Sequence, residues 1–327
     1  MSSITLGIDI SKAKFDAALY QAEQYHQATF SNKKDGYRRL AKWLKKRGGK
    51  DAHVCLEATS RYGEEVALYL HERGFPVSIV NPARIKAYAG SQLKRNKTDQ
   101  EDAKVIAHFC ATQKPRLWEP LSLEVRELQA LTRHLDSLKS DRAREMNRKQ
   151  SNVPSDRVLQ SIDEHIGFLD DQITALEEQV RGLIDRHPPL RQQRDLLISI
   201  PGIGDIAAAK FIAEVPDVSR FDSAAQLAAY AGLTPRIQHS GSSVHRRGKL
   251  VKTGNVRFRT AFYMPALAAM RYNPIIQAMV RRLDARGKSR MTIVGAVMRK
   301  LVHLAYGVLK HGRPFDPDYL VNVQDIA

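Results

Sequence analysis

Four carboxylates are placed where they could bind divalent metal ions. Asp9 follows the apolar run ITLGI and Glu57 follows HVCL, so each ends a segment with the pattern of a buried strand. Asp99 and Asp102 are three residues apart in NKTDQEDAKVIAHF, which places both on one face of a predicted helix. An acid among apolar strand residues destabilises the fold unless a cation or a hydrogen-bond donor pairs with it. A metal site is therefore one interpretation of the set.

Carboxylate oxygens are the ligands that Mg²⁺ prefers, and such a site leaves positions for water and phosphate oxygens. Two ions about 3.5–4 Å apart can stabilise both the attacking and the leaving oxygen of a phosphoryl transfer. The chemistry predicted for the set is phosphoryl transfer with two Mg²⁺ ions, for which Mn²⁺ could substitute. Each acid also has an ordinary explanation, because strand-end acids often lie near solvent and acids in a first helical turn complement the helix dipole.

A second candidate for chemistry is the stretch PRIQHSGSSVHRRGKLVK. Clusters of Ser and Gly between charged residues are typical of solvated linkers, which is the interpretation that composition favours. A serine here is also a candidate nucleophile if the cations hold a phosphate. The segment lacks the G-x-S-x-G elbow of serine hydrolases, so hydrolase chemistry at His239-Ser240 is not indicated. The cations around the serines are Arg236, Arg246, Arg247, Lys249 and Lys252.

The elements that must position these residues fall into three regions, of which residues 1–122 alternate strand and helix patterns. Strands are expected in ITLGIDIS, AKFDAALYQ, AHVCLEAT and PVSIVNP, and helices in GYRRLAKWLKKRG and GEEVALYLHERG. Such alternation predicts an α/β sheet with helices packed on it. Thr98 and Glu101 form a capping box, so the helix with Asp99 and Asp102 is expected to have Thr98 as its cap.

Residues 123–190 have the pattern of a helical hairpin or coiled coil. Apolar residues recur at spacings of four and three from Leu128 to Leu138, and again from Ile162 to Leu183. Two interpretations remain open. The seam either closes an antiparallel hairpin within one chain or joins two chains in a dimer.

Residues 191–327 are predicted to be mostly helical, around the basic serine segment. SIPGIG lies between two helical patterns, as in a helix-hairpin-helix, and Gly202 and Gly204 would permit its tight turn. Free amides at the start of the following helix can hold a phosphate without reading the base sequence. An ordinary tight turn between two helices is the alternative.

The overall charge favours a polyanionic partner. The chain of 327 residues has 52 Lys and Arg against 35 Asp and Glu, a net charge of +17, and nucleic acid is the first candidate. From Gly232 onward 17 Lys and Arg stand against four acids, so this third carries +13 of the total. No basic amphipathic stretch with aromatic anchors favours a membrane surface. No charge-free apolar run approaches the roughly 20 residues that span a bilayer, so we expect no membrane partner.

The cysteines and the N-terminus predict a cytoplasmic protein. Cys55 and Cys110 have neither metal-ligand nor disulfide spacing, which is typical of a reducing compartment. The N-terminus enters a strand pattern at once, without the charged region and long apolar core of a signal peptide.

Seven long motifs occur in order along the chain: GIDISKAKFD, CLEATSRYGE, VNPARIKAYA, RNKTDQEDAKVIAHF, SIPGIG, LAAYAGLTP and SGSSVHRRGK. Together they resemble the insertion sequence 110 family of DEDD transposases, which are bridge-RNA-guided recombinases. The resemblance implies a RuvC-like, ribonuclease-H-type domain with metal ligands at Asp9, Glu57, Asp99 and Asp102. It also implies a C-terminal transposase domain whose nucleophile is the first serine of SGSS, Ser240.

In the reaction that the resemblance implies, Ser240 attacks a DNA phosphate and becomes a phosphoserine link to the strand. Ser242 and Ser243 would support the loop, although residue chemistry alone leaves either of them open as the nucleophile. Metal coordination is the natural activation for a weakly nucleophilic hydroxyl. The implied partners are donor and target DNA, a bridge-type non-coding RNA and further copies of the chain in a dimer or tetramer, at the nucleoid of a prokaryotic cytoplasm.

The RNA partner rests on the resemblance alone. No aromatic RNP pattern occurs, so RNA would be held by backbone contacts and shape. Two other functions remain open: a metal-dependent DNA nuclease or Holliday-junction-type resolvase that uses only the carboxylates, and an architectural nucleic-acid binder. Candidate nucleic-acid contacts are the five cations around the serines, the two glycines of SIPGIG, and the cations of QLKRNK, which are Lys94, Arg95 and Lys97.

Overall fold

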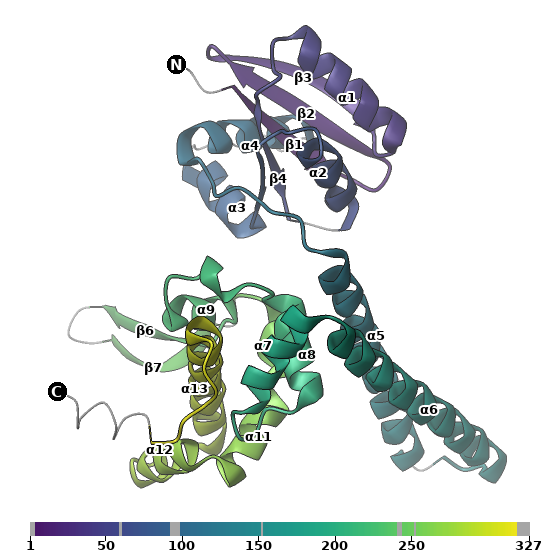
Figure 1. Ribbon diagram of the computed structural model, residues 1–327, viewed down its shortest axis with the longest axis vertical. Helices are drawn as coiled ribbons and strands as arrows, with labels where there is room; N and C mark the ends of the chain where they lie inside the picture. Colours follow the sequence, from purple (N-terminus) through teal and green to yellow (C-terminus); the bar gives the residue numbers. More distant parts are fainter. Residues whose placement is uncertain are drawn as a thin grey trace. The chain divides into compact units, whose positions relative to one another are not determined.

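The chain divides into two compact units, Met1–Pro120 and Leu121–Ala327 (Figure 1). Each unit has its own core, so each is described by itself. The computed structural model describes residues 4–58, 61–91, 99–151, 153–240, 244–251 and 253–318. For residues 61, 99, 100, 236–240, 244–249 and 251 it describes the backbone alone.

The N-terminal unit is built on a five-stranded sheet in the order β3-β2-β1-β4-β5. Strands β1, β2 and β3 form an antiparallel meander, and β4 and β5 run parallel to β1. This mixed α/β arrangement is consistent with the ribonuclease-H-type domain that the resemblance implies. The strands are β1 (Thr5–Ile10), β2 (Lys14–Gln21), β3 (Gln24–Ser31), β4 (His53–Glu57) and β5 (Val77–Val80).

Helices cover both faces of this sheet. Helices α1 and α2 pack on the face that carries Leu6 and Ile8, and α4 packs on the opposite face beside Gly7. Helix α1 forms because its buried residues recur every three or four positions, and because Lys45 and Lys46 in its last turn complement the helix dipole. The helices are α1 (Lys34–Lys46), α2 (Glu64–His71), α3 (Pro82–Ser91) and α4 (Asp99–Gln113), with a 3-10 turn at Arg61–Gly63.

A side chain at Gly7 would collide with α4. An added Cβ would lie 2.2 Å from the carbonyl oxygen of Ala103 and 2.3 Å from the amide nitrogen of Ala107. These are backbone atoms of a helix, so neither can move without shifting α4 off the sheet. We expect Gly7→Ala to lower the free energy of unfolding of this unit by about 3 kcal/mol, measured by urea titration.

The matched control for this prediction is Gly90→Ala on α3. A Cβ at Gly90 meets no atom within 4 Å, and alanine favours a helix more than glycine does. The control should therefore leave the unfolding midpoint unchanged or raise it slightly. Equal midpoints for the two variants would contradict the close packing of α4 on β1.

The C-terminal unit begins with two long helices that form an antiparallel hairpin, α5 (Leu123–Gln150) and α6 (Asp156–Arg186) (Figure 1). The apolar seam of α6 between Ile162 and Leu183 is buried, and part of it packs on Leu135 of α5. The seam is thus covered within one chain, as in the first of the two interpretations above. Ion pairs that join the two helices are Lys139–Glu177, Arg142–Asp170 and Lys149–Asp163.

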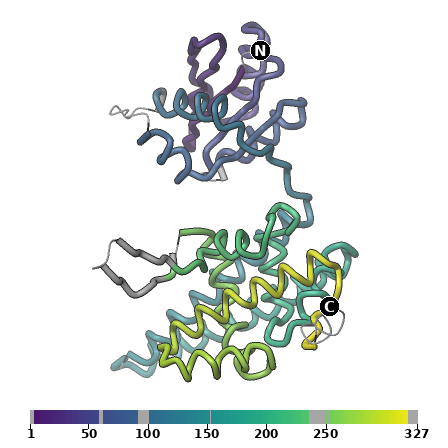
Figure 2. Tube along the Cα trace, turned by 90° about the vertical axis from the view of Figure 1, so that its left-hand side faces the viewer, coloured from purple at the N-terminus to yellow at the C-terminus, as the bar shows by residue number. Residues whose placement is uncertain are grey.

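The remaining helices of this unit surround one core, whose fully buried residues include Leu197, Phe258 and Leu301. Helix α13 contacts α7, α9, α11 and α12 and extends along this helical unit (Figure 2). Among the described helices, only α13 is long and apolar enough to cross a membrane, and its apolar residues are part of the core. The helices are α7 (Pro188–Ile198), α8 (Asp205–Glu214), α9 (Ala224–Tyr230), α10 (Val256–Ala261), α11 (Tyr263–Tyr272), α12 (Pro274–Ala285) and α13 (Arg290–His311), with a 3-10 turn at Val218–Arg220.

Candidate active site

Helix α4 lies directly on strand β1. The hydroxyl of Thr5 donates a hydrogen bond to the carbonyl oxygen of Ala107 at 2.9 Å. The missing side chain at Gly7 lets Ala103 and Ala107 approach the strand. Alternate residues of a strand share a face, so Asp9 lies on the same face as these two β1 residues. Asp9 is half-buried there.

These contacts also fix the direction of α4 along β1. Ala107, whose carbonyl accepts the hydrogen bond from Thr5, comes one helical turn after Ala103, whose carbonyl lies against Gly7. Four residues of helix rise about 6 Å and two residues of strand rise about 6.7 Å, so the two elements stay in step. One further turn places the start of α4, at Asp99, level with Asp9. The same spacing predicts that Asp99 lies at the end of the unit where Asp9 is found.

Glu57 reaches the same end from the neighbouring strand. Strand β4 runs parallel to β1, and Ile8 pairs with Leu56 one residue before each of the two acids. Cys55, two residues before Glu57, is buried among residues of α4, so Glu57 also faces α4. Asp9, the next-to-last residue of β1, and Glu57, the last residue of β4, thus lie on the same face at the same end of the sheet.

The four acids supply oxygen donors of the kind that Mg²⁺ uses. Asp9, Glu57 and Asp102 are each half-buried. Asp99 is the first residue of α4, with a side chain outside the described part, and the predicted cap Thr98 lies outside the described residues. Among the described side chains, no three of the types His, Cys, Asp and Glu form a group able to hold a metal ion. The four residues fit Mg²⁺ by donor type, Asp9 and Glu57 share a face of the sheet, and ligation itself stays a prediction.

A fifth carboxylate lies opposite Asp9. Asp16 of β2 pairs with Asp9 in the antiparallel register and is buried. It accepts a hydrogen bond from the hydroxyl of Thr29, and the ammonium of Lys14 lies 3.5 Å away. Like charges opposite each other destabilise a sheet, and the nearby Lys14 offsets part of that repulsion. The sequence does not single out Asp16, because a strand pattern does not give the register between two strands.

Cys55 of β4 and Cys110 of α4 belong to one buried apolar cluster. Both are buried, and the Cys110 thiol donates to the carbonyl oxygen of His53 at 3.5 Å. A hydrogen bond with Cys55 and burial raise the pKa of the Cys110 thiol, and burial lowers the pKa of His53. Cys110 and His53 are therefore neutral near pH 7, so neither adds a charge to the core between β4 and α4.

The serine segment forms two strands, which corrects its interpretation as a linker. Strands β6 (Thr234–Ser240) and β7 (Val244–Val251) pair antiparallel with a bulge near Arg236, and Ser240 lies opposite Val244. Ser240 is therefore the last residue of β6, in what we call the serine hairpin, β6 and β7. For Arg236, Arg246, Arg247 and Lys249 the structure describes the backbone alone. Outside the described residues are Ser242, Ser243, Lys252, Lys94, Arg95 and Lys97.

The SIPGIG turn joins α7 to α8, and Gly202 lies against α11. Its φ is +108°, and an added Cβ would lie 2.7 Å from the Cβ of Ala269. That side of the turn is occupied by protein, so Gly202 is needed for packing. Gly204 directly precedes α8, and a Cβ there meets no atom within 4 Å. Phosphate binding at this turn stays a prediction, with Gly204 as the open position.

Two family matches together cover most of the chain. Residues 6–155 match the IS110-type DEDD family, described as "Transposase", and residues 194–281 match the "Transposase IS116/IS110/IS902 family". The chain is also 36% identical over 320 residues to the pilin gene-inverting protein of Moraxella bovis, across 97% of this chain and 98% of that protein. This chain belongs to the IS110 family of transposases.

Other relatives of this IS110-family transposase are named for insertion sequences. The transposase of element IS1111A from Coxiella burnetii is 26% identical, across 61% of this chain and 61% of that protein. The transposase of element IS1328 from Yersinia enterocolitica is 23% identical, across 96% of this chain and 99% of that protein. The first family match contains all four predicted carboxylates, and the second contains Ser240.

Five exposed cations lie at the end of α12, in the turn that follows it and at the start of α13 of this transposase. Within the described part of the chain, none of the five forms an ion pair with an acid, whereas many cations of α5 and α6 do. Phosphates bind cations that are not already neutralised, so this turn is a candidate DNA contact. Sequence analysis located the excess charge in this third of the chain and did not single out these residues, which are Arg281, Arg282, Arg286, Lys288 and Arg290.

We expect the double variant Arg286→Gln/Lys288→Gln to weaken binding to duplex DNA about tenfold at about 0.1 M salt. The slope of log affinity against log salt should fall by about two, one for each lost phosphate contact. Fluorescence anisotropy measures both quantities. The matched control is Arg142→Gln/Lys149→Gln, which removes two cations already paired with acids, and an equal loss in this control would contradict the assignment.

Proposed function

We propose that this transposase cuts and rejoins DNA strands through a phosphoserine intermediate at Ser240. The observation that carries the proposal is the match over nearly the whole chain to a protein named for inverting a gene. Inversion of a DNA segment requires each cut strand to be joined to a new partner. A nuclease leaves free ends and cannot do this, whereas a covalent intermediate conserves the phosphodiester energy until the strands have exchanged.

In the first step, Ser240 Oγ forms a bond to a DNA phosphorus as the bond from that phosphorus to one strand breaks. The serine hydroxyl loses its proton to solvent or a base, and the departing strand oxygen gains one and becomes a hydroxyl. In the second step, a hydroxyl of another strand attacks the phosphoserine and releases the serine. Each step exchanges one P–O bond for another, so no nucleotide cofactor is consumed. The assignment is supported by the family match over residues 194–281, which includes Ser240.

The metal ligands in this proposal are Asp9, Glu57, Asp99 and Asp102. Bound Mg²⁺, or Mn²⁺ in its place, would favour deprotonation of the attacking hydroxyl and stabilise charge on the leaving oxygen. The shared face and shared sheet end of Asp9 and Glu57 support this part of the proposal. Asp16 lies opposite Asp9 and would contribute negative charge close to that site.

A structured, bridge-type RNA is proposed as the guide to donor and target DNA, on the strength of the family resemblance. The net charge of +17 and the exposed cations at the α12–α13 turn support binding to polyanions. We propose further that the protein acts as a dimer or tetramer at the nucleoid of a prokaryotic cytoplasm.

The experiment that tests the proposal incubates the full chain with donor DNA, target DNA, RNA and Mg²⁺, and then denatures the products. The expected result is recombined DNA together with a protein–DNA adduct that survives denaturation. Free cut ends without an adduct would indicate the alternative, a nuclease or resolvase that uses only the carboxylates. Intact DNA would indicate an architectural binder.

A further inference from the structure

The two ends of the segment that carries the serine hairpin meet at Tyr230 and Asn255. The backbone amide of Asn255 donates to the carbonyl oxygen of Tyr230 at 2.7 Å, and its side-chain amide donates to the Tyr230 hydroxyl at 3.0 Å. Gly254 permits this approach, because an added Cβ would lie 2.4 Å from the Tyr230 carbonyl oxygen. The hairpin therefore leaves the helical core and returns to it at one point.

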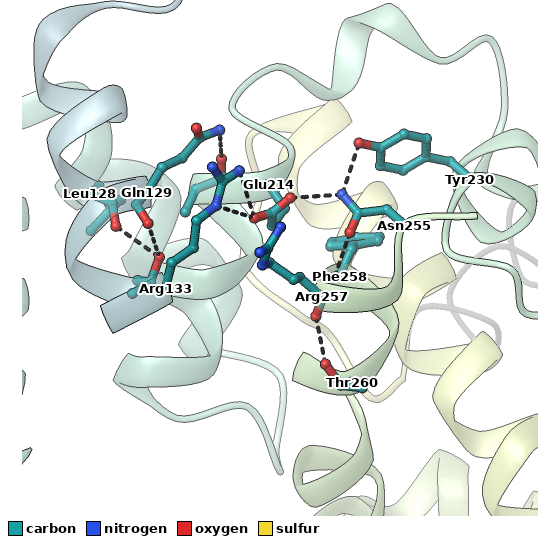
Figure 3. A network of polar contacts seen from close by, with 11 residues as sticks. Leu128, Gln129, Arg133, Glu214, Tyr230, Asn255, Arg257, Phe258 and Thr260 are labelled. Carbon is teal, nitrogen blue, oxygen red and sulfur yellow. Dashed lines mark hydrogen bonds and ion pairs between the residues drawn. The ribbon is translucent and has the colours of Figure 1, made fainter. Parts of the chain in front are cut away.

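One carboxylate joins that point to a distant helix (Figure 3). Glu214, the last residue of α8, accepts a hydrogen bond from the Asn255 side chain at 2.7 Å. Its other oxygen accepts from Nε and Nη2 of Arg133 on α5, both at 3.3 Å. The Glu214 side chain is 10% exposed, so solvent screens these charge-assisted bonds weakly.

Glu214 also belongs to a row of polar contacts between α5 and α8. Gln129 donates to a backbone carbonyl of α8 at 2.7 Å, Arg133 binds Glu214, and Asp136 binds Lys210. The spacing of the three α5 residues keeps them on one face of that helix. Among the described residues of this row, Glu214 is the one that also accepts a hydrogen bond from Asn255 at the base of the hairpin.

We propose that Glu214 is a positioning residue for the serine hairpin, which it fixes to helix α5 through Arg133 and Asn255. The inference rests on the proposed role of Ser240 as the nucleophile. It gives a physical reason for the network in Figure 3, in which Arg133 lies 81 residues before Glu214 and Asn255 lies 41 residues after it.

A small rotation at the base of the hairpin displaces Ser240 at the far end of β6. The seven residues of β6 span about 20 Å, so a rotation of about 10° at the base moves the end by about 3.5 Å. A misplacement of about 1 Å between reacting atoms can lower a rate about 10²-fold. A loosened base would therefore slow the attack by Ser240 without removing any group that contacts DNA in this proposal.

A substitution of Asn255 offers a second way to break the link between Glu214 and the base of the hairpin. Its side-chain oxygen accepts a hydrogen bond from the Phe258 amide at 3.0 Å and so caps α10. Serine is an equally good cap, so Asn255→Ser retains the cap while it removes the side-chain bonds to Glu214 and Tyr230. Burial raises the pKa of Tyr230, so its hydroxyl stays neutral in the physiological range and provides no charge to replace the lost contact.

The test measures two quantities on the full chain carrying Glu214→Ala or Asn255→Ser. The first is the hydrogen-exchange rate of β6 and β7 amides without DNA, which should rise about tenfold in both variants. The second is the rate of adduct formation at saturating DNA, which should fall about 10²-fold at an unchanged half-saturating DNA concentration. Lys210→Met is the matched control, because it breaks a neighbouring α5–α8 contact that does not involve the hairpin, and it should behave as the wild type.

The two measurements separate failure of this inference from failure of the proposed function. Unchanged exchange of β6 and β7 in both variants overturns the inference, as does loosened exchange with a normal adduct rate. An equal effect of Lys210→Met also overturns it, because the effect would then be general weakening of the α5–α8 interface. A wild-type protein that forms no adduct overturns the role of Ser240, while the exchange rates still decide whether Glu214 fixes the hairpin.

Discussion

Replacing Ser240 with alanine should abolish the denaturation-resistant DNA adduct and lower recombination by about a thousandfold or more. The physical reason is that no other group can accept the phosphoryl bond at that position, so both chemical steps lose their covalent intermediate. DNA affinity should stay close to that of the wild type, because a single uncharged hydroxyl adds little to binding that is dominated by cations and phosphates. Denaturing gel electrophoresis with labelled DNA measures the adduct.

The matched controls are Ser242→Ala and Ser243→Ala, which remove the same atom two or three residues away. Both should retain the adduct, with at most a moderate loss of rate. If Ser240→Ala still forms the adduct and one of the other two variants does not, the nucleophile has been assigned to the wrong serine. If all three variants recombine DNA, the serine mechanism itself is wrong.

Asp9→Asn should lower the rate of adduct formation by about a thousandfold, and Glu57→Gln should have a similar effect. Each change keeps the size of the side chain and removes one anionic ligand, so the affinity for the metal ion falls while the fold is retained. Isothermal titration with Mn²⁺ in the absence of DNA provides a readout that does not depend on activity. It should show weaker metal binding by both variants.

Asp35→Asn on α1 is the control for these two changes. Asp35 forms an exposed ion pair with Arg39, which contributes little to stability, so both metal binding and rate should be unaffected. Wild-type Mn²⁺ affinity in Asp9→Asn and Glu57→Gln would contradict the metal assignment. A loss of metal binding with normal recombination would separate the carboxylates from the chemistry.

The sequence predicts much of the N-terminal sheet, and the exceptions have physical reasons. The apolar runs in the sequence coincide with strands β1, β2, β4 and β5, because these strands are largely buried in the sheet. Strand β3, QYHQATFS, was not predicted, since it lies at the edge of the sheet and is half-exposed with mostly polar residues. The serine hairpin was missed for a similar reason: its Ser, Gly and Arg content resembles a loop, and its strands pair only with each other.

The candidate site was predictable where a residue's own segment indicates its role. Asp9 and Glu57 each follow an apolar run, and both lie at the same end of the sheet. Asp16 and the network around Glu214 were not predicted, because they depend on strand register and on contacts between distant segments. Such contacts leave no periodic pattern in the sequence.

The measurement that tests the central claim most directly is the identification of the residue bound to DNA. The adduct is digested with nuclease and trypsin, and the peptide of residues 237–246, which contains all three serines, is fragmented in a mass spectrometer. The account predicts a nucleotide phosphate on Ser240 in the wild type and no modified peptide in Ser240→Ala. A nucleotide on any other residue, or recombination without a modified residue, would contradict it.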